Sequence, residues 1–91
     1  MRLEGKIAVV SGAAAGIGRA TVERLASEGA TVYAGDLSFE KSEDSAGIHR
    51  RHLDVRKLES WQQLADEVAR AGGASILVNN AGLVGAMVES G

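Results

Sequence analysis

The sequence predicts an α/β fold in which a doubly wound parallel sheet carries helices on both of its faces. Short apolar stretches alternate along the 91 residues with longer segments of helical periodicity. This alternation implies parallel strands that are joined by right-handed crossovers. A glycine-rich turn follows the first apolar stretch, where such sheets place a ligand. We therefore expect a single domain over residues 1–91, truncated to about four strands in the order 3-2-1-4.

The first half of the chain contains two predicted strands around one helix. Residues 7–11 are continuously apolar, which is typical of a strand covered on both faces. A helical pattern follows and ends at Glu28 and Gly29, because glycine accepts the left-handed conformation just past a helix end. Residues 31–36 are rich in β-formers and end in a carboxylate. The expected buried face of the helix consists of Ile17, Ala20, Thr21 and Leu25.

The second half contains two further predicted strands and a second helix. Residues 37–47 are polar and poorly patterned, so any helix there is short. Residues 48–55 predict a strand at a sheet edge, because they carry two arginines beside two histidines. A better helix is predicted over residues 57–71, and residues 75–79 form a fourth apolar strand. The expected apolar stripe of this helix consists of Trp61, Leu64, Ala65 and Val68.

Composition excludes several classes of function. The formal net charge is −2 and no run of lysine or arginine occurs, which gives no footprint for nucleic acid or an anionic membrane. Cysteine is absent, so we expect neither a disulfide nor a thiolate metal site. We predict no other metal-binding residues. The N-terminus lacks the apolar region of a signal peptide, and no apolar run approaches the ~20 residues that span a bilayer. We expect a cytoplasmic protein.

The glycine-rich turn at residues 11–18 is the first candidate for a functional site. Gly12, Gly16 and Gly18 leave room for a tight turn, for close approach of a pyrophosphate and for close packing of helix on strand. The helix N-terminus then offers free N–H groups and a positive dipole end to the phosphates. The spacing differs from the general dinucleotide fingerprint, so an ordinary glycine-rich connection remains the alternative.

Asp36 gives this turn a more specific meaning. It ends the second predicted strand about 20 residues further on, where the fingerprint expects an acid for the ribose hydroxyls. A carboxylate there accepts hydrogen bonds from both hydroxyls and repels a 2′-phosphate. No lysine or arginine stands at residues 13–15 or at Leu37 to offset that repulsion, so NAD(H) is favoured over NADP(H). The alternative is a solvated turn carboxylate.

Four motifs together resemble the short-chain dehydrogenase/reductase family over the full length of the chain. They are the glycine turn, Asp36, the pair Asp54-Val55, and the run Asn-Asn-Ala-Gly at residues 79–82. The resemblance implies the N-terminal, cofactor-binding half of a Rossmann-like NAD(P)-dependent oxidoreductase. It assigns cofactor contacts to Gly12, Gly16, Ile17 and Gly18 at the pyrophosphate, Asp36 and Leu37 at the adenine ribose, Asp54 and Val55 at the adenine ring, and Asn80 and Ala81 in the cleft.

Structural roles remain open for several of these polar residues. For Asp54 the role of a helix N-cap or Asx-turn residue is as open as the contact with adenine, and the two roles are compatible. Asn79 and Asn80 both have the alternative of satisfying backbone groups at a strand end, which we favour for Asn79. His49 and His52 have no patterned acid nearby, so we interpret them as surface residues of an edge strand rather than bases or ligands.

The resemblance also implies catalytic residues that have no counterpart in the sequence. The family uses a serine, a tyrosine and a lysine four residues after that tyrosine, whereas the single tyrosine here is Tyr33 and Leu37 stands four residues later. We expect no catalytic residue, and an inactive chain that binds NAD(H). The alternatives are an enzyme whose remaining sequence is lost and a non-enzymatic NAD-sensing or assembly module that uses a bare sheet edge.

That bare edge is the fourth strand, which carries three consecutive apolar residues at 76–78. Such an edge tends to pair with another chain. We expect a homo-oligomer, either a homodimer joined at the fourth-strand edges or one in which residues 83–88 cover a neighbour.

Overall fold

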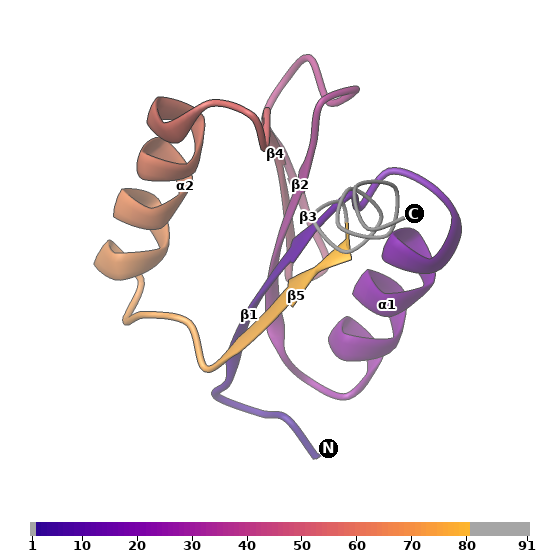
Figure 1. Cartoon of the computed structure of the whole chain (residues 1–91). Coiled ribbons are helices and arrows are strands. Elements are labelled where there is room, and N and C mark those ends of the chain that lie inside the picture. Colours follow the sequence, from indigo (N-terminus) through magenta and orange to yellow (C-terminus); the bar gives the residue numbers. More distant parts are fainter. Residues whose placement is uncertain (1, 81–91) are drawn as a thin grey trace, which may run out of the picture.

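The computed structural model describes residues 2–80 and contains one five-stranded sheet with a helix on each face (Figure 1). The strand order is β3-β4-β2-β1-β5, and all pairs are parallel except β3 with β4. The four parallel strands thus confirm the predicted order, with one short strand added at an edge. The elements are β1 (Ile7–Ser11), α1 (Gly16–Ser27), β2 (Thr31–Asp36), β3 (Glu43–Ser45), β4 (Ile48–His52), α2 (Leu58–Arg70) and β5 (Ile76–Asn79).

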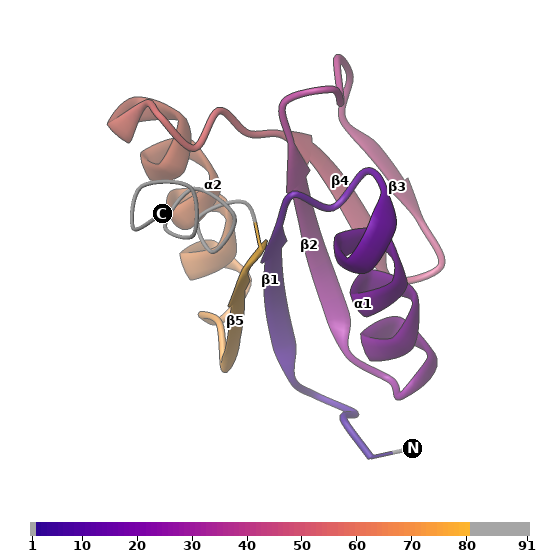
Figure 2. The same ribbon diagram turned by 45° about the vertical axis from the view of Figure 1, so that its right-hand side comes forward.

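The added strand β3 corrects two expectations about the middle of the chain. The polar segment 37–47 contributes a strand, and β4 lies inside the sheet instead of at its edge, as Figure 2 shows. Ala46 and Gly47 join β3 to β4 with φ angles of 51° and 79°. Positive φ at both residues matches the right-handed twist of a tight hairpin. Arg50 also reaches across the pair, to Ser45 Oγ at 3.1 Å.

Helix α1 turns a different face to the sheet from the one expected. Gly18 and Val22 are buried, with Leu25 packed against the same core, whereas Ile17 and Ala20 are exposed. The expected stripe is therefore wrong at Ile17 and Ala20. The reason is steric, because α1 packs against the backbone carbonyl of Gly12 at Gly18, where a Cβ would have no room.

Helix α2 covers the opposite face and confirms most of its predicted stripe. Leu64 and Val68 are buried in a cluster with Val9 and Leu53, and Trp61 packs against them. Ala65 is exposed at the side of this contact, where the helix surface turns toward solvent. No helix within residues 2–80 is long and apolar enough to cross a membrane.

Charged residues tie β3 and α2 to β4. The guanidinium of Arg51 donates to both carboxylate oxygens of Glu67 on α2, at 2.8 and 3.1 Å, and to Asp44 on β3 at 2.6 Å. His49 bonds the same carboxylate of Asp44 at 2.9 Å and stacks on Tyr33 with ring centroids 4.7 Å apart. His49 is thus half-buried with an acid partner, which the interpretation of a plain surface residue missed.

Candidate nucleotide-binding site

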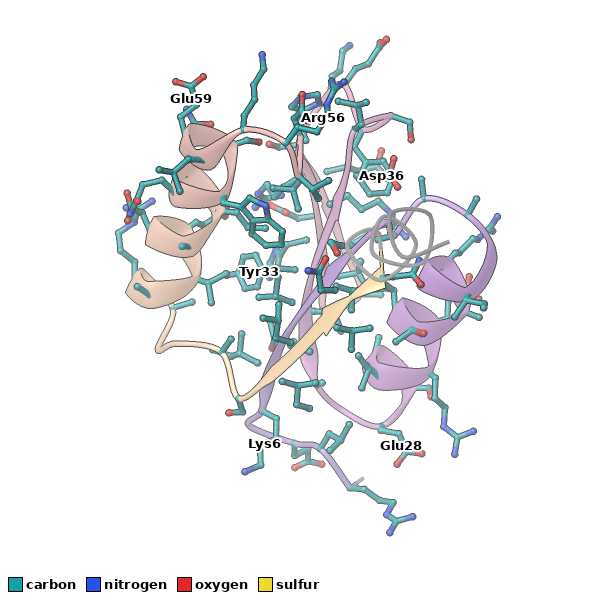
Figure 3. The ribbon with its side chains drawn as sticks, viewed as in Figure 1. Lys6, Glu28, Tyr33, Asp36, Arg56 and Glu59 are labelled. Carbon is teal, nitrogen blue, oxygen red and sulfur yellow. The ribbon has the colours of Figure 1, made fainter. Side chains whose placement is uncertain are left out.

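The carboxyl ends of β1, β2 and β4 meet at one end of the sheet, together with the N-terminus of α1. Figure 3 shows Asp36 and Arg56 at this end, and Lys6 and Glu28 at the other. Open parallel sheets bind ligands outside the carboxyl ends of their strands, in the crevice that forms where the strand order reverses. The predicted site residues within residues 2–80 gather around it.

The turn that leads into α1 is built around missing side chains. Gly16 has a φ angle of 60° and nothing within 4 Å of where a Cβ would lie, so the space above it is open. At Gly18 a Cβ would collide with the carbonyl oxygen of Gly12 and would lie 2.8 Å from its carbon. The N-cap residue, Ala15, makes no side-chain cap, and the first turn carries no acid. The helix N-terminus therefore keeps free N–H groups and a positive dipole end, both suited to a phosphate.

Asp36 lies at the carboxyl end of β2 with its carboxylate held in place. Oδ2 accepts from the backbone N–H of Ala14 at 3.1 Å, and Oδ1 accepts from the N–H and hydroxyl of Ser38 at 2.9 and 2.8 Å. Burial by itself raises the pKa of Asp36, but the three hydrogen bonds outweigh it and leave the pKa below its usual value. Asp36 is therefore ionised at neutral pH, and it fastens the glycine turn to the strand end. The turn-carboxylate alternative describes its contact with Ser38, and the contact with Ala14 goes beyond it.

Asp54 follows β4 and is buried. Its carboxylate accepts from the backbone N–H of Arg56 at 3.1 Å and from two guanidinium nitrogens of the same residue, each at 3.0 Å. These side-chain hydrogen bonds from Arg56 are the main reason that the pKa of Asp54 falls to about 2. Asp54 is thus an Asx-turn residue, but it is not the helix N-cap, because that position belongs to Lys57.

A hollow of about 320 Å³ lies between these two carboxylates. Leu37 is 53% exposed at its rim and Val55 is also exposed there, while Ile17 is 77% exposed on the first turn of α1. Three of the large hydrophobic side chains that face solvent are therefore residues predicted to contact a cofactor. The lining residues of the hollow are Gly12, Asp36, Leu37, Leu53, Asp54, Val55 and Arg56.

The two asparagines at the end of β5 hold the turn after β1. The buried hydroxyl of Ser11 donates to Asn79 Oδ1 at 2.8 Å, and Asn80 Nδ2 donates to the carbonyl oxygen of Gly12 at 3.4 Å. These contacts favour the structural interpretation of both asparagines. Ala81, the remaining predicted site residue, lies outside the described residues.

Sequence reasoning missed three residues of this site. Arg56 and Leu53 line the hollow, and Ser38 orients Asp36. Arg56 and Ser38 each stand two residues after an aspartate, which is the spacing of an Asx turn. That spacing was the available signal. Nothing local marks Leu53 as a wall of the hollow.

Comparisons with known proteins agree with this geometry. A family model described as short chain dehydrogenase matches residues 6–90. The chain is 43% identical over 91 residues to an uncharacterized oxidoreductase, YxbG of Bacillus subtilis, covering 90% of this chain and 33% of that protein. It is 39% identical over 92 residues to the 3-oxoacyl-acyl-carrier-protein reductase FabG of Thermotoga maritima, covering 91% and 37% respectively.

A solved structure gives the same result. A short-chain dehydrogenase/reductase from Serratia marcescens is 37% identical with a TM-score of 0.76, and the match covers 88% of this chain and 37% of that one. The chain therefore spans about a third of the length of the curated relatives it matches. These comparisons give no support to the alternative of an assembly module.

Proposed function

Because this chain belongs to the short-chain dehydrogenase family, whose members bind a nicotinamide cofactor, we propose that it is the NAD(H)-binding portion of an oxidoreductase. The observation that carries the proposal is the ionised carboxylate of Asp36, which is held beside an open glycine turn and a hollow of about 320 Å³. The glycine turn suits the phosphates of a dinucleotide, the carboxylate of Asp36 suits the ribose, and the hollow suits the base. The three features are neighbours in the structure, as the three groups are in the ligand.

The residues fit the cofactor in a definite order. The pyrophosphate takes the open space above Gly16, where Gly12 and Gly18 allow close approach and Ile17 covers the ligand. The adenine ribose reaches Asp36 and Leu37. The remaining predicted contacts are Asp54 and Val55 at the adenine ring, and Asn80 and Ala81 in the cleft. When bound, the cofactor supplies hydride chemistry, and these residues bind and orient it.

We further propose that the site prefers NAD(H) to NADP(H). The lowered pKa of Asp36 keeps a negative charge where a 2′-phosphate needs a cation. Arg56 is the one cation among the described residues that line the hollow, and it is already paired with Asp54. The ribose of NAD(H) instead offers two hydroxyl donors to the carboxylate.

The first prediction tests this proposal at Asp36. Asp36→Ala is expected to weaken NAD⁺ binding roughly 10- to 100-fold, because hydrogen bonds to a charged acceptor contribute about 1.5–3 kcal/mol. The same change is expected to reduce the preference for NAD⁺ over NADP⁺, since it removes the carboxylate that repels the 2′-phosphate. Isothermal titration calorimetry of both nucleotides at pH 7 measures both effects. Asp66→Ala, at an exposed carboxylate on α2, is the matched control. Unchanged NAD⁺ affinity in Asp36→Ala contradicts the proposal.

The 91 residues by themselves are proposed to bind the nucleotide without turning over a substrate. The single tyrosine, Tyr33, is buried in β2 against His49 and is not among the residues that line the hollow. Tyr33 is therefore not part of the site proposed for the nucleotide. We also propose a cytoplasmic location, which the absence of cysteine suits.

The second prediction concerns the edge strand β5, through which we propose that the chain forms a homodimer. Within the described residues β5 has a partner on one side only, and its Leu77 is exposed. Leu77→Lys is expected to convert the dimer to a monomer, because a charge on an edge strand opposes pairing between chains. Multi-angle light scattering at micromolar concentration, with circular dichroism to verify folding, measures this. An unsubstituted chain that is monomeric with full helicity contradicts the dimer. The alternative contact through residues 83–88 lies outside the described residues.

A further inference from the structure

Arg56 occupies an unusual place at the rim of the hollow. Its Nε and one Nη each donate to a different oxygen of Asp54, both at 3.0 Å, and its own backbone N–H donates to the same carboxylate at 3.1 Å. Such a bidentate ion pair holds the guanidinium and the carboxylate in one plane. The side chain of Asp54 is only 7% exposed, whereas that of Arg56 is 76% exposed. The guanidinium is therefore fixed at its inner edge, while much of its surface is open.

The charge of Arg56 is already compensated where it stands. Asp54 is buried, so breaking the pair would leave an uncompensated carboxylate beneath the hollow, which is costly. Arg56 is thus poorly placed to move toward a phosphate. What it offers instead is a flat and weakly hydrated cationic surface, of the kind that stacks on aromatic rings.

The rest of the hollow suits a flat apolar ring. Leu37 and Val55 present exposed aliphatic surface to it, and Leu53 is buried at its base. The faces of a planar aromatic ring have no hydrogen-bond donors or acceptors. Aliphatic side chains and the face of a guanidinium can contact them without leaving a polar group unpaired. A donor at the edge of the ring meets the remaining acceptor position of Asp54, because a carboxylate has about four such positions and Arg56 fills three of them.

We propose that Arg56 is a specificity residue for the base of the nucleotide, stacking its guanidinium on the adenine ring while it holds Asp54 toward the edge of that ring. This inference rests on the proposed function, because it places the adenine of NAD(H) in the hollow between Asp36 and Arg56. It adds a direct contact at a position outside the motifs that the family resemblance assigned. It also makes the Asp54-Arg56 pair, and not Asp54 alone, the unit that recognises the base.

The experiment is a titration of the 91-residue chain with adenosine monophosphate, nicotinamide mononucleotide and NAD⁺, followed by ¹H–¹⁵N correlation NMR. This readout detects weak binding and requires no turnover. Arg56→Ala is expected to weaken adenosine monophosphate roughly fivefold to tenfold, which is the size of a partly desolvated cation–π contact. Nicotinamide mononucleotide lacks the adenine, so its affinity is expected to stay unchanged. In the unsubstituted chain the Nε–H signal of Arg56 shifts upfield on binding, as it does above an aromatic ring.

Two further variants separate stacking from charge and from folding. Arg56→Lys keeps a cation beside Asp54 but has no planar face, so it is expected to restore thermal stability and leave adenosine monophosphate binding weak. Arg24→Ala is the matched control. The side chain of Arg24 is also 76% exposed and also pairs with one acid, Glu28, but Arg24 lies on α1, which contributes no residue to the lining of the hollow. It is expected to change no affinity.

The remaining outcomes of these titrations contradict either the stacking role of Arg56 alone or the proposed function as well. Adenosine monophosphate binding that is unchanged in Arg56→Ala, or fully restored in Arg56→Lys, overturns the stacking role while the cofactor proposal stands. A larger loss for NADP⁺ than for NAD⁺ in Arg56→Ala overturns it in favour of a phosphate contact. Failure of the unsubstituted chain to bind NAD⁺ and adenosine monophosphate overturns this inference and the proposed function together.

Discussion

Replacing Gly18 with alanine is expected to destabilise the fold by about 3 kcal/mol and to abolish nucleotide binding. The added Cβ would overlap the carbonyl oxygen of Gly12 and would lie 3.1 Å from Asn80 Nδ2. The obstacle is backbone, so no side chain can rotate out of the way. Helix α1 must move off the turn, and its N-terminus then leaves the phosphate position. Urea unfolding followed by circular dichroism measures the loss, and calorimetry with NAD⁺ measures binding.

Gly5→Ala provides the control for this substitution. Gly5 has a φ angle of 80° with nothing within 4 Å of the Cβ position, so alanine there meets backbone strain but no collision. The expected cost is about 1–2 kcal/mol, with NAD⁺ affinity retained in the folded fraction. Equal losses of stability and binding in Gly5→Ala and Gly18→Ala contradict the steric argument.

Leu53→Ala is expected to destabilise the fold by about 2–5 kcal/mol, because it empties a fully buried position. Leu53 is 1% exposed and packs against Val9, Tyr33, Leu64 and Val68 on the α2 face of the sheet. A small domain has a total stability of only about 5 kcal/mol at the low end, so this single change unfolds a large share of the molecules. Thermal melting followed by circular dichroism at 222 nm measures the effect.

Gly35→Ala distinguishes packing at Leu53 from a general weakening of the sheet. A Cβ at Gly35 would lie 2.7 Å from Leu53 Cδ2 and 2.9 Å from Leu53 Cβ. Leu53→Ala removes the contacts with Cγ and Cδ2 but keeps the contact with Cβ. Gly35→Ala should therefore be more destabilising beside leucine than beside alanine, with a coupling of about 1–3 kcal/mol in the double-mutant cycle. Costs that simply add would show that the two residues do not share this space.

This coupling links the core to the site. Gly35 immediately precedes Asp36, and Leu53 immediately precedes Asp54. Their close contact sets the spacing between the two carboxylates that border the hollow. A change in packing at these two residues therefore alters the geometry that the nucleotide meets.

Much of the arrangement could be predicted because it depends on local pattern. The apolar stretch at residues 7–11 and the acid at the end of residues 31–36 each indicated a strand of a parallel sheet, and the structure places both. Strand β3 was missed, because it is short and polar and only its pairing with β4 defines it. Polar residues at an exposed edge show no hydrophobic periodicity to read.

The sequence by itself determined the position of the glycine turn and the placement of Asp36, because each depends on residues close together in the chain. The order of the parallel strands followed from the alternation of strands and helices and the handedness of their crossovers. Only the tertiary structure decided which face α1 buries, since that follows from the contact of Gly18 with Gly12 and the bond from Asn80, 68 residues away from Gly12. It also decided that Arg56 faces the hollow. A guanidinium can extend in many directions, and the buried carboxylate of Asp54 selects one of them.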